Sequence, residues 1–217
     1  MREMIAGLIA RYPDLEPCRG DVERAYGVLH DTFAGGGKLL ACGNGGSAAD
    51  AEHVVGELMK GFHFQRPLGA EARAALAAAA PQDSGYLSEH LQGALPAVSL
   101  VGHPSLATAI ANDVAPDMVF AQQVHGLGRT GDALLCISTS GDSINVLRAA
   151  QVARAGSLKV VGLTGSTGGR LAQWCDVCIR VPFTEVSQVQ ERHLPVYHTL
   201  CRMLEAAFFA DSQRGPG

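Results

Sequence analysis

Five short, largely apolar runs constrain the fold of this chain more than any other feature of its sequence. They lie at residues 38–43, 97–102, 132–139, 159–165 and 176–182, and helix-like stretches separate them. The runs show no alternation of apolar and polar residues, which is typical of parallel strands buried on both faces. The sequence therefore predicts an α/β fold with a doubly wound five-stranded parallel sheet. In such sheets ligands bind beyond the carboxyl ends of the strands.

The segments outside these runs are predicted to be helices of one domain, residues 1–217. A chain of 217 residues that is 47% hydrophobic can bury a single large core. Asp21 is expected to cap a helix that ends at Phe33, and Ser47 to cap another that continues to Lys60. The alanine-rich stretch 61–96 has no strand character, so it is predicted to be a helical insertion. The other helices are expected within 1–35 and at 104–111, 116–126, 143–155, 168–174 and 187–212.

Charge and cysteine content exclude several classes of protein. The net charge of −4 is too acidic for a nucleic-acid-binding surface. Neither a signal peptide nor a membrane-spanning apolar stretch is evident, so a soluble cytoplasmic protein without a membrane partner is expected. Cys175 and Cys178 form a C-x-x-C motif that leads into a strand rather than a helix, which favours a structural over a redox role.

A glycine-rich loop follows the first predicted strand. Its residues Asn44, Gly45, Gly46 and Ser47 belong to GNGGSA, which matches the dinucleotide-binding pattern G-x-G-x-x-A. We reject that function because no second strand, ending in an acid for the ribose, follows the helix. Backbone N–H groups at a helix start still suit an anion. A tight turn without a ligand is the alternative.

A hydroxyl-rich loop follows the strand at 132–139. It contributes Ser138, Thr139, Ser140 and Ser143, and it holds no lysine, so it is not the loop of a P-loop NTPase. Hydroxyls at a helix start can bind phosphate, or they can simply cap and turn the chain. Two such loops at the carboxyl ends of strands favour a phosphorylated small molecule.

The candidates for proton transfer or metal binding lie on two helices. His53 and Glu57 are four residues apart and share a helix face, which suits metal chelation as well as a plain surface pair. The last predicted helix adds Gln190, Glu191, His193 and His198. Whether the two sets meet is not determined by their spacing.

Five segments together resemble the sugar isomerase (SIS) domain family. They are GNGGSAADAEHVVGEL, AIANDVAPDMVF, ISTSGDSINV, LTGSTGG and VQERHLPVYH. The pairing of H-x-x-x-E with Q-x-x-x-x-x-x-x-H is similar to the phosphoheptose isomerase branch of that family. This resemblance implies a flavodoxin-like SIS domain. It also implies an aldose–ketose isomerase that converts D-sedoheptulose 7-phosphate to D-glycero-D-manno-heptose 7-phosphate through an enediol, in the biosynthesis of nucleotide-activated heptose.

The resemblance also implies roles for particular residues. Glu57 corresponds to the catalytic base and His198 to its acid–base partner. One Zn²⁺ ion per subunit is expected on His53, Glu57, Gln190 and His198. The substrate and its phosphate are expected to contact Asn44, Gly45, Gly46, Ser47, Asn112, Asp113, Ser138, Thr139, Ser140, Ser143 and Gln190. The family forms homotetramers whose sites are shared between subunits.

Three alternatives remain open from the sequence. Gln190 and His198 are eight residues apart, about 12 Å along a helix, so either both lean toward one metal across Pro195 or the ligands come from different subunits. The substrate could be another ketose phosphate. The chain could also be a non-catalytic SIS module that binds a phosphosugar or serves as an adaptor protein.

Overall fold

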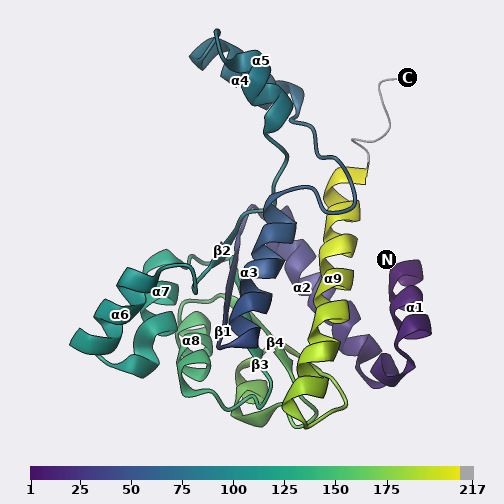
Figure 1. The fold of residues 1–217 in the computed structure, drawn as a ribbon, viewed down its shortest axis with the longest axis vertical. Coiled ribbons are helices and arrows are strands. Elements are labelled where there is room, and N and C mark those ends of the chain that lie inside the picture. The colour runs from purple at the N-terminus through teal and green to yellow at the C-terminus, as the bar shows by residue number, and fades with distance from the viewer. Residues whose placement is uncertain (211–217) are drawn as a thin grey trace.

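The sheet of the computed structural model, which describes residues 1–210, consists of five parallel strands (Figure 1). They lie in the order β2-β1-β3-β4-β5, with parallel pairing throughout. This confirms the predicted doubly wound α/β fold and puts the switch in strand order beside β1, where ligands bind in such sheets. The strands are β1 (Leu39–Gly43), β2 (Ala97–Ser99), β3 (Ala133–Ser138), β4 (Lys159–Thr164) and β5 (Val177–Arg180).

Helices cover both faces of the sheet because alternate strand residues point to opposite sides. Leu39 and Ala41 pack into one apolar cluster, whereas Leu40 and Cys42 pack into the other. The first cluster lies under α1 (Arg2–Arg11), α2 (Arg19–Ala34), α3 (Gly46–Met59) and α9 (Val186–Phe209). The second lies under α7 (Val119–Leu127) and α8 (Ile144–Ala155), and α6 (Pro104–Asp113) packs outside it against α7.

Several expected boundaries were wrong in their details. Asp21 lies inside α2, because the 3-10 helix η1 (Pro13–Cys18) runs directly into α2 at Arg19. Ser47 is the second residue of α3, and Gly45 takes the N-cap position with a left-handed φ of +55°. The stretch at 168–174 forms a 3-10 helix, η3 (Gly169–Trp174), as η2 (Pro116–Met118) does earlier. Residues 211 and 212 of the expected last helix lie outside the described residues.

The middle of the insertion stands clear of the body (Figure 1). It contains two short helices, α4 (Ala70–Ala79) and α5 (Ser84–His90), and neither has a buried residue. Its base is closed by an antiparallel bridge between Pro67 and Gln92. Among the described residues, no helix is long and apolar enough to cross a membrane.

The fully buried His193 makes the stability of this fold depend on pH. Burial lowers the pKa of His193 from 6.5 to about 4. Between these values the unfolded chain binds a proton that the folded chain does not. We therefore expect the free energy of unfolding to fall as the pH drops from 6.5 toward 4, by up to about 3 kcal/mol from this group.

Urea denaturation at pH 7.5 and pH 5 would measure this dependence. His193→Leu removes the titrating group, so its loss of stability between the two pH values should be smaller than that of the unchanged chain. An equal loss in both proteins would contradict the assignment.

Candidate active site

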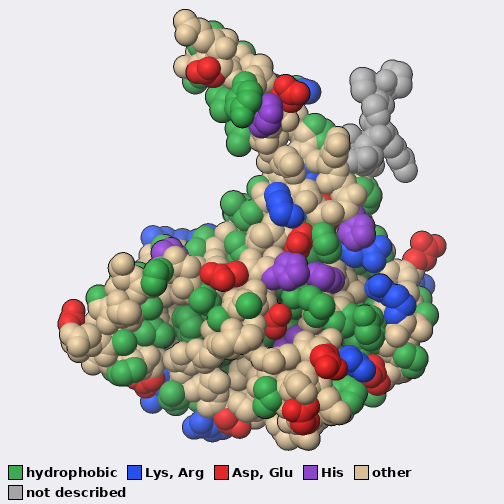
Figure 2. Space-filling view, in the orientation of Figure 1, with side chains coloured by type: hydrophobic (Ala, Val, Ile, Leu, Met, Phe, Trp, Pro, Cys, Tyr) green, Lys and Arg blue, Asp and Glu red, His purple; other side chains and the backbone are tan. Residues whose placement is uncertain are grey.

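Two helices bring the predicted acid–base residues together. His53 and Glu57 stand one turn apart on α3, which packs against α9. His53 Nε2 lies 3.2 Å from Glu57 Oε1 and 3.3 Å from His198 Nε2, which α9 supplies. The Glu57 side chain is 11% exposed, whereas that of His53 is 41% exposed, so the cluster lies at the surface (Figure 2). The candidate residues of the two helices, His53 and Glu57 on α3 and His198 on α9, thus come together within a single chain.

A hydrogen-bond chain that the sequence reasoning missed orients His53. The Tyr197 hydroxyl donates to Asp50 Oδ1 at 3.1 Å and lies 3.0 Å from His53 Nδ1. Because the hydroxyl proton goes to Asp50, its oxygen accepts the N–H of Nδ1. Nε2, on the other side of the His53 ring, faces Glu57 and His198. The available signal was the position of Asp50, three residues before His53 on the same helix face.

The electrostatics of the cluster keep His198 neutral. Partial burial lowers the pKa of His198, and the neighbouring His53 and Arg11 lower it further, while Glu57 opposes them. A neutral imidazole has one nitrogen that donates and one that accepts a hydrogen bond. The lowered pKa therefore favours a His198 ring that carries one donor and one acceptor nitrogen.

The two polar loops line one cavity of about 280 Å³ beyond the carboxyl ends of β1 and β3. The Ser138 hydroxyl donates to Ser143 Oγ at 3.2 Å. The Ser140 hydroxyl instead accepts the backbone N–H of Asp142 and does not line the cavity. The predicted residues around the cavity are Asn44, Gly45, Gly46, Ser47, Ser138, Thr139, Ser143 and Gln190.

Close packing explains why the first loop holds its shape. A Cβ atom at Gly43 would lie 2.4 Å from the carbonyl oxygen of Ser47, so the strand can turn into α3 only with glycine there. The side-chain amides of Asn44 and Asn145 exchange two hydrogen bonds, of 2.8 and 2.9 Å. Asn145 was missed by the sequence reasoning. It ties the glycine-rich loop to the start of α8, which carries the hydroxyl-rich loop.

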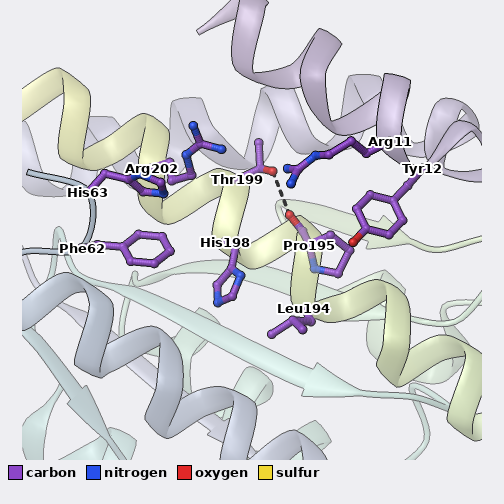
Figure 3. A pocket seen from close by; sticks show the side chains of 9 residues that line it. All are labelled: Arg11, Tyr12, Phe62, His63, Leu194, Pro195, His198, Thr199 and Arg202. Carbon is purple, nitrogen blue, oxygen red and sulfur yellow. Dashed lines mark hydrogen bonds between the residues drawn. The ribbon is translucent and has the colours of Figure 1, made fainter.

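Three predicted residues lie away from the His53 cluster. Gln190 packs on Gly46, at the start of α3, with its Nε2 2.4 Å from where a Cβ would sit. That position is seven residues before His53, about 10 Å along the helix. Asn112 and Asp113 are exposed at the end of α6, where Asn112 Nδ2 donates to Asp113 Oδ1, and they line neither this cavity nor the one beside His198 that Figure 3 shows.

The donors near His53 meet the requirements of zinc only in part. Ligands of a tetrahedral zinc with bonds of about 2.0–2.1 Å lie about 3.3 Å apart, which both measured separations match. Within residues 1–210, however, no three His, Cys, Asp or Glu side chains are grouped so that they could hold one ion. A single chain therefore offers two pairs of suitable donors, His53 with Glu57 and His53 with His198, rather than a complete set of zinc ligands.

A buried ion pair, also missed by the sequence reasoning, fixes the segment that follows α3. Arg66 Nε donates to Glu205 Oε1 at 3.0 Å, and neither side chain is exposed. The same guanidinium donates to the carbonyl oxygens of Leu58 and Glu57, closing the C-terminal end of α3. Glu205 also accepts two backbone N–H groups of the segment 62–63. The C-terminal end of α3 and the segment that follows it are thereby held on α9.

The sequence matches a known family. The family model described as SIS domain matches residues 15–94 and 74–165. The chain belongs to the SIS domain family.

Within that family, its similarity is to phosphoheptose isomerases. The enzyme of that name from Rhodospirillum rubrum is 40% identical over 193 residues, which cover 89% of each chain. The solved phosphoheptose isomerase of Neisseria gonorrhoeae is 33% identical, with a TM-score of 0.69, over 92% of this chain and 94% of that one. The structure from Francisella tularensis is 31% identical, with a TM-score of 0.73, over 90% of both chains.

Loss of one partner of the buried pair should destabilise the protein strongly. Arg66→Ala leaves the carboxylate of Glu205 buried without its cation, at an expected cost of about 3–5 kcal/mol in unfolding free energy. Arg170 forms an exposed pair with Asp142 and serves as the matched control, since Arg170→Ala should cost less than about 1 kcal/mol. Urea denaturation measures both, and equal small losses would refute the role of Arg66.

Proposed function

We propose that this chain is an aldose–ketose isomerase that converts D-sedoheptulose 7-phosphate to D-glycero-D-manno-heptose 7-phosphate. The observation that carries the proposal is the contact of His53 with both Glu57 and His198. The helices that carry these groups, α3 and α9, also contribute residues to the wall of the cavity between the two polar loops. The chain is similar to phosphoheptose isomerases. The product would enter the biosynthesis of nucleotide-activated heptose.

The loop cavity suits the phosphate of the substrate. Ser47, Ser138, Thr139 and Ser143 turn toward it, and it opens at the N-terminal ends of α3 and α8. Hydroxyl donors and helix N-termini both favour a dianion. Binding energy from the phosphate, which is remote from the reacting carbons, can orient the other end of the sugar.

Isomerisation moves a proton between C1 and C2 through an enediol. In our proposal the Glu57 carboxylate takes the proton from one carbon and returns it to the other. His198 moves the proton between the two oxygens, which its neutral ring permits. The chain from Asp50 through Tyr197 holds His53 beside both groups.

We further propose that one zinc ion per subunit binds His53, Glu57 and His198, with a glutamine as the fourth ligand; the three side chains, which a single chain offers only as donor pairs, would have to draw together around the ion. Such an ion would polarise the sugar carbonyl. Because Gln190 packs at the start of α3, the glutamine would come from another copy of the chain. This favours a homotetramer with shared sites. Six free cysteines fit a reducing compartment, and we propose the cytoplasm.

The first test is incubation with sedoheptulose 7-phosphate in deuterium oxide, followed by proton NMR. The expected product is aldoheptose phosphate with deuterium at C2. Glu57→Gln should lower kcat roughly 10²–10⁴-fold, as expected for loss of a general base. Ser143→Ala should instead raise KM about 10–100-fold, because a hydrogen bond to a charged group contributes about 1.5–3 kcal/mol.

Glu57→Gln tests the proposed general base, whereas Ser143→Ala tests the proposed phosphate-binding cavity. Full turnover by Glu57→Gln would exclude Glu57 as the base. The absence of any aldose with the unchanged protein and added zinc would favour another ketose phosphate or a non-catalytic SIS module.

The zinc proposal is tested by metal analysis of the purified protein. We expect close to one zinc per chain, and His53→Ala should lose most of it. His63→Ala is the matched control, since His63 lies beside His198 but is not a proposed ligand. Equal zinc content in all three proteins would contradict the site.

A further inference from the structure

The two cysteines of the C-x-x-C motif, Cys175 and Cys178, lie together over Gly162 of β4. A Cβ atom at Gly162 would sit 2.7 Å from Cys175 Sγ and 3.2 Å from Cys178 Sγ. The missing side chain of this glycine leaves the space that both sulfur atoms fill. The sequence favoured a structural role for the motif because it leads into a strand, but the structure shows that its two thiols are neighbours.

This pair of thiols can be reached from outside the protein. β5, which carries Cys178, is the last strand of the sheet, so the pair lies at the sheet edge. Both cysteines of the motif are partly exposed, whereas the other four cysteines of the chain are buried. A small reagent at this edge therefore meets Cys175 and Cys178 before any other thiol.

The two thiols differ in their readiness to ionise. Contact with the Cys175 thiol lowers the pKa of Cys178, and the Thr164 hydroxyl, 3.5 Å from its sulfur, adds to this effect against partial burial. The same contact and burial raise the pKa of Cys175. Because the thiolate is the nucleophile in thiol chemistry, Cys178 reacts first and Cys175 stands beside it as the second thiol.

Cys175 is joined to the hydroxyl-rich loop through η3. Its thiol donates to the carbonyl oxygen of Leu171, within η3, at 3.3 Å, and the Leu171 N–H donates to the Gly141 carbonyl at 2.9 Å. A Cβ atom at Gly169, the first residue of η3, would sit 2.5 Å from the Ser140 carbonyl oxygen, so η3 packs directly on the loop. A movement of the Cys175 sulfur is therefore passed on to this loop.

We propose that Cys175 and Cys178 are a redox-active dithiol, which a small-molecule disulfide such as glutathione disulfide oxidises and a thiol reduces again. The bond between the two sulfurs takes the Cys175 thiol away from the Leu171 carbonyl, and η3 then shifts against the hydroxyl-rich loop. Oxidation thereby loosens the cavity that this loop lines. Disulfides in a reducing compartment are typically transient and serve as redox sensors.

The exchange proceeds in two steps. The Cys178 thiolate attacks one sulfur of glutathione disulfide, whose S–S bond breaks and releases one glutathione thiolate. Cys175 then loses its proton and attacks the Cys178 sulfur of the mixed disulfide, and the second glutathione thiolate leaves. The two leaving thiolates take up the protons that the two cysteines lose. Two protein thiols are oxidised and one small disulfide is reduced, without a further co-reactant.

Mass spectrometry tests the pair directly, since residues 171–180 form one tryptic peptide that holds both cysteines. The folded chain is incubated with excess glutathione disulfide, then denatured and alkylated with N-ethylmaleimide. The peptide should lose the mass of two hydrogens and take up no maleimide, and dithiothreitol should reverse both changes. Cys18→Ala removes a buried thiol and is the control, which should be oxidised in the same way. A peptide that is still alkylated at both cysteines would overturn the proposal.

Single variants test the order of the two steps. Cys175→Ser lacks the second thiol, so one glutathione should stay attached to Cys178. Cys178→Ser lacks the nucleophile and should carry about tenfold less glutathione at the same time, because a thiol of higher pKa supplies less thiolate. An equal or larger adduct on Cys178→Ser would refute Cys178 as the first nucleophile.

Hydrogen exchange measures the effect on the loop without any substrate. The backbone amides of residues 138–147 should exchange at least about twofold faster in the oxidised chain than in the reduced one, whereas those of α2 should not change. The double variant Cys175→Ser with Cys178→Ser should exchange at the same rate with and without glutathione disulfide. Unchanged exchange in the fully oxidised chain would refute the link between the pair and the loop.

These measurements do not depend on the proposed reaction. In an active isomerase, oxidation should also raise the KM for sedoheptulose 7-phosphate, and dithiothreitol should restore it. A protein that forms the disulfide and loosens its loop but leaves sedoheptulose 7-phosphate unchanged would refute only the proposed reaction.

Discussion

The packing of α3 against α9 is the constraint on which the candidate site depends. α3 leaves β1 at the switch in strand order, so its start borders the loop cavity and its later turns carry His53 and Glu57. α9 runs alongside it in the same direction and supplies Gln190 near its start and His198 further on. One helix pair therefore sets the distance between the loop cavity and the cluster of His53, Glu57 and His198. In the proposed reaction these two regions would hold the phosphate and the reacting carbons, which lie at opposite ends of the sugar.

Buried polar contacts keep this helix pair in register. The chain from Asp50 to Tyr197 crosses between the helices beside His53. At the far end the pair of Arg66 and Glu205 joins the last turn of α3 to α9. Such contacts contribute little net stability when complete, but they are costly to break. Their effect is to disfavour a slip of one helix along the other, which would separate Glu57 from its partners.

Local pattern sufficed for the sheet and for the identity of the two loops. The strands were predictable because their apolar runs are buried on both faces, and the loops because glycine and hydroxyl residues follow β1 and β3 directly. The pair of Arg66 and Glu205 was not predictable, since its members are 139 residues apart and neither has a local signal. The sequence indicated only that Gln190 and His198 are eight residues apart. That Gln190 lies at the start of α3, away from His53, follows from how α9 packs on α3.

The exposure of the cluster is the remaining physical problem of a single subunit. An enediol is protected, and a general base is strengthened, when water is kept from the site. Yet the side chain of His53 is 41% exposed. The cavity beside His198 is open and cationic, since Arg11 and Arg202 line it (Figure 3). The helices α4 and α5 of the insertion are uncovered as well, since neither has a buried residue. In the homotetramer that we propose, another copy of the chain would lie against such surfaces, so that assembly would also serve the chemistry by keeping water from the cluster.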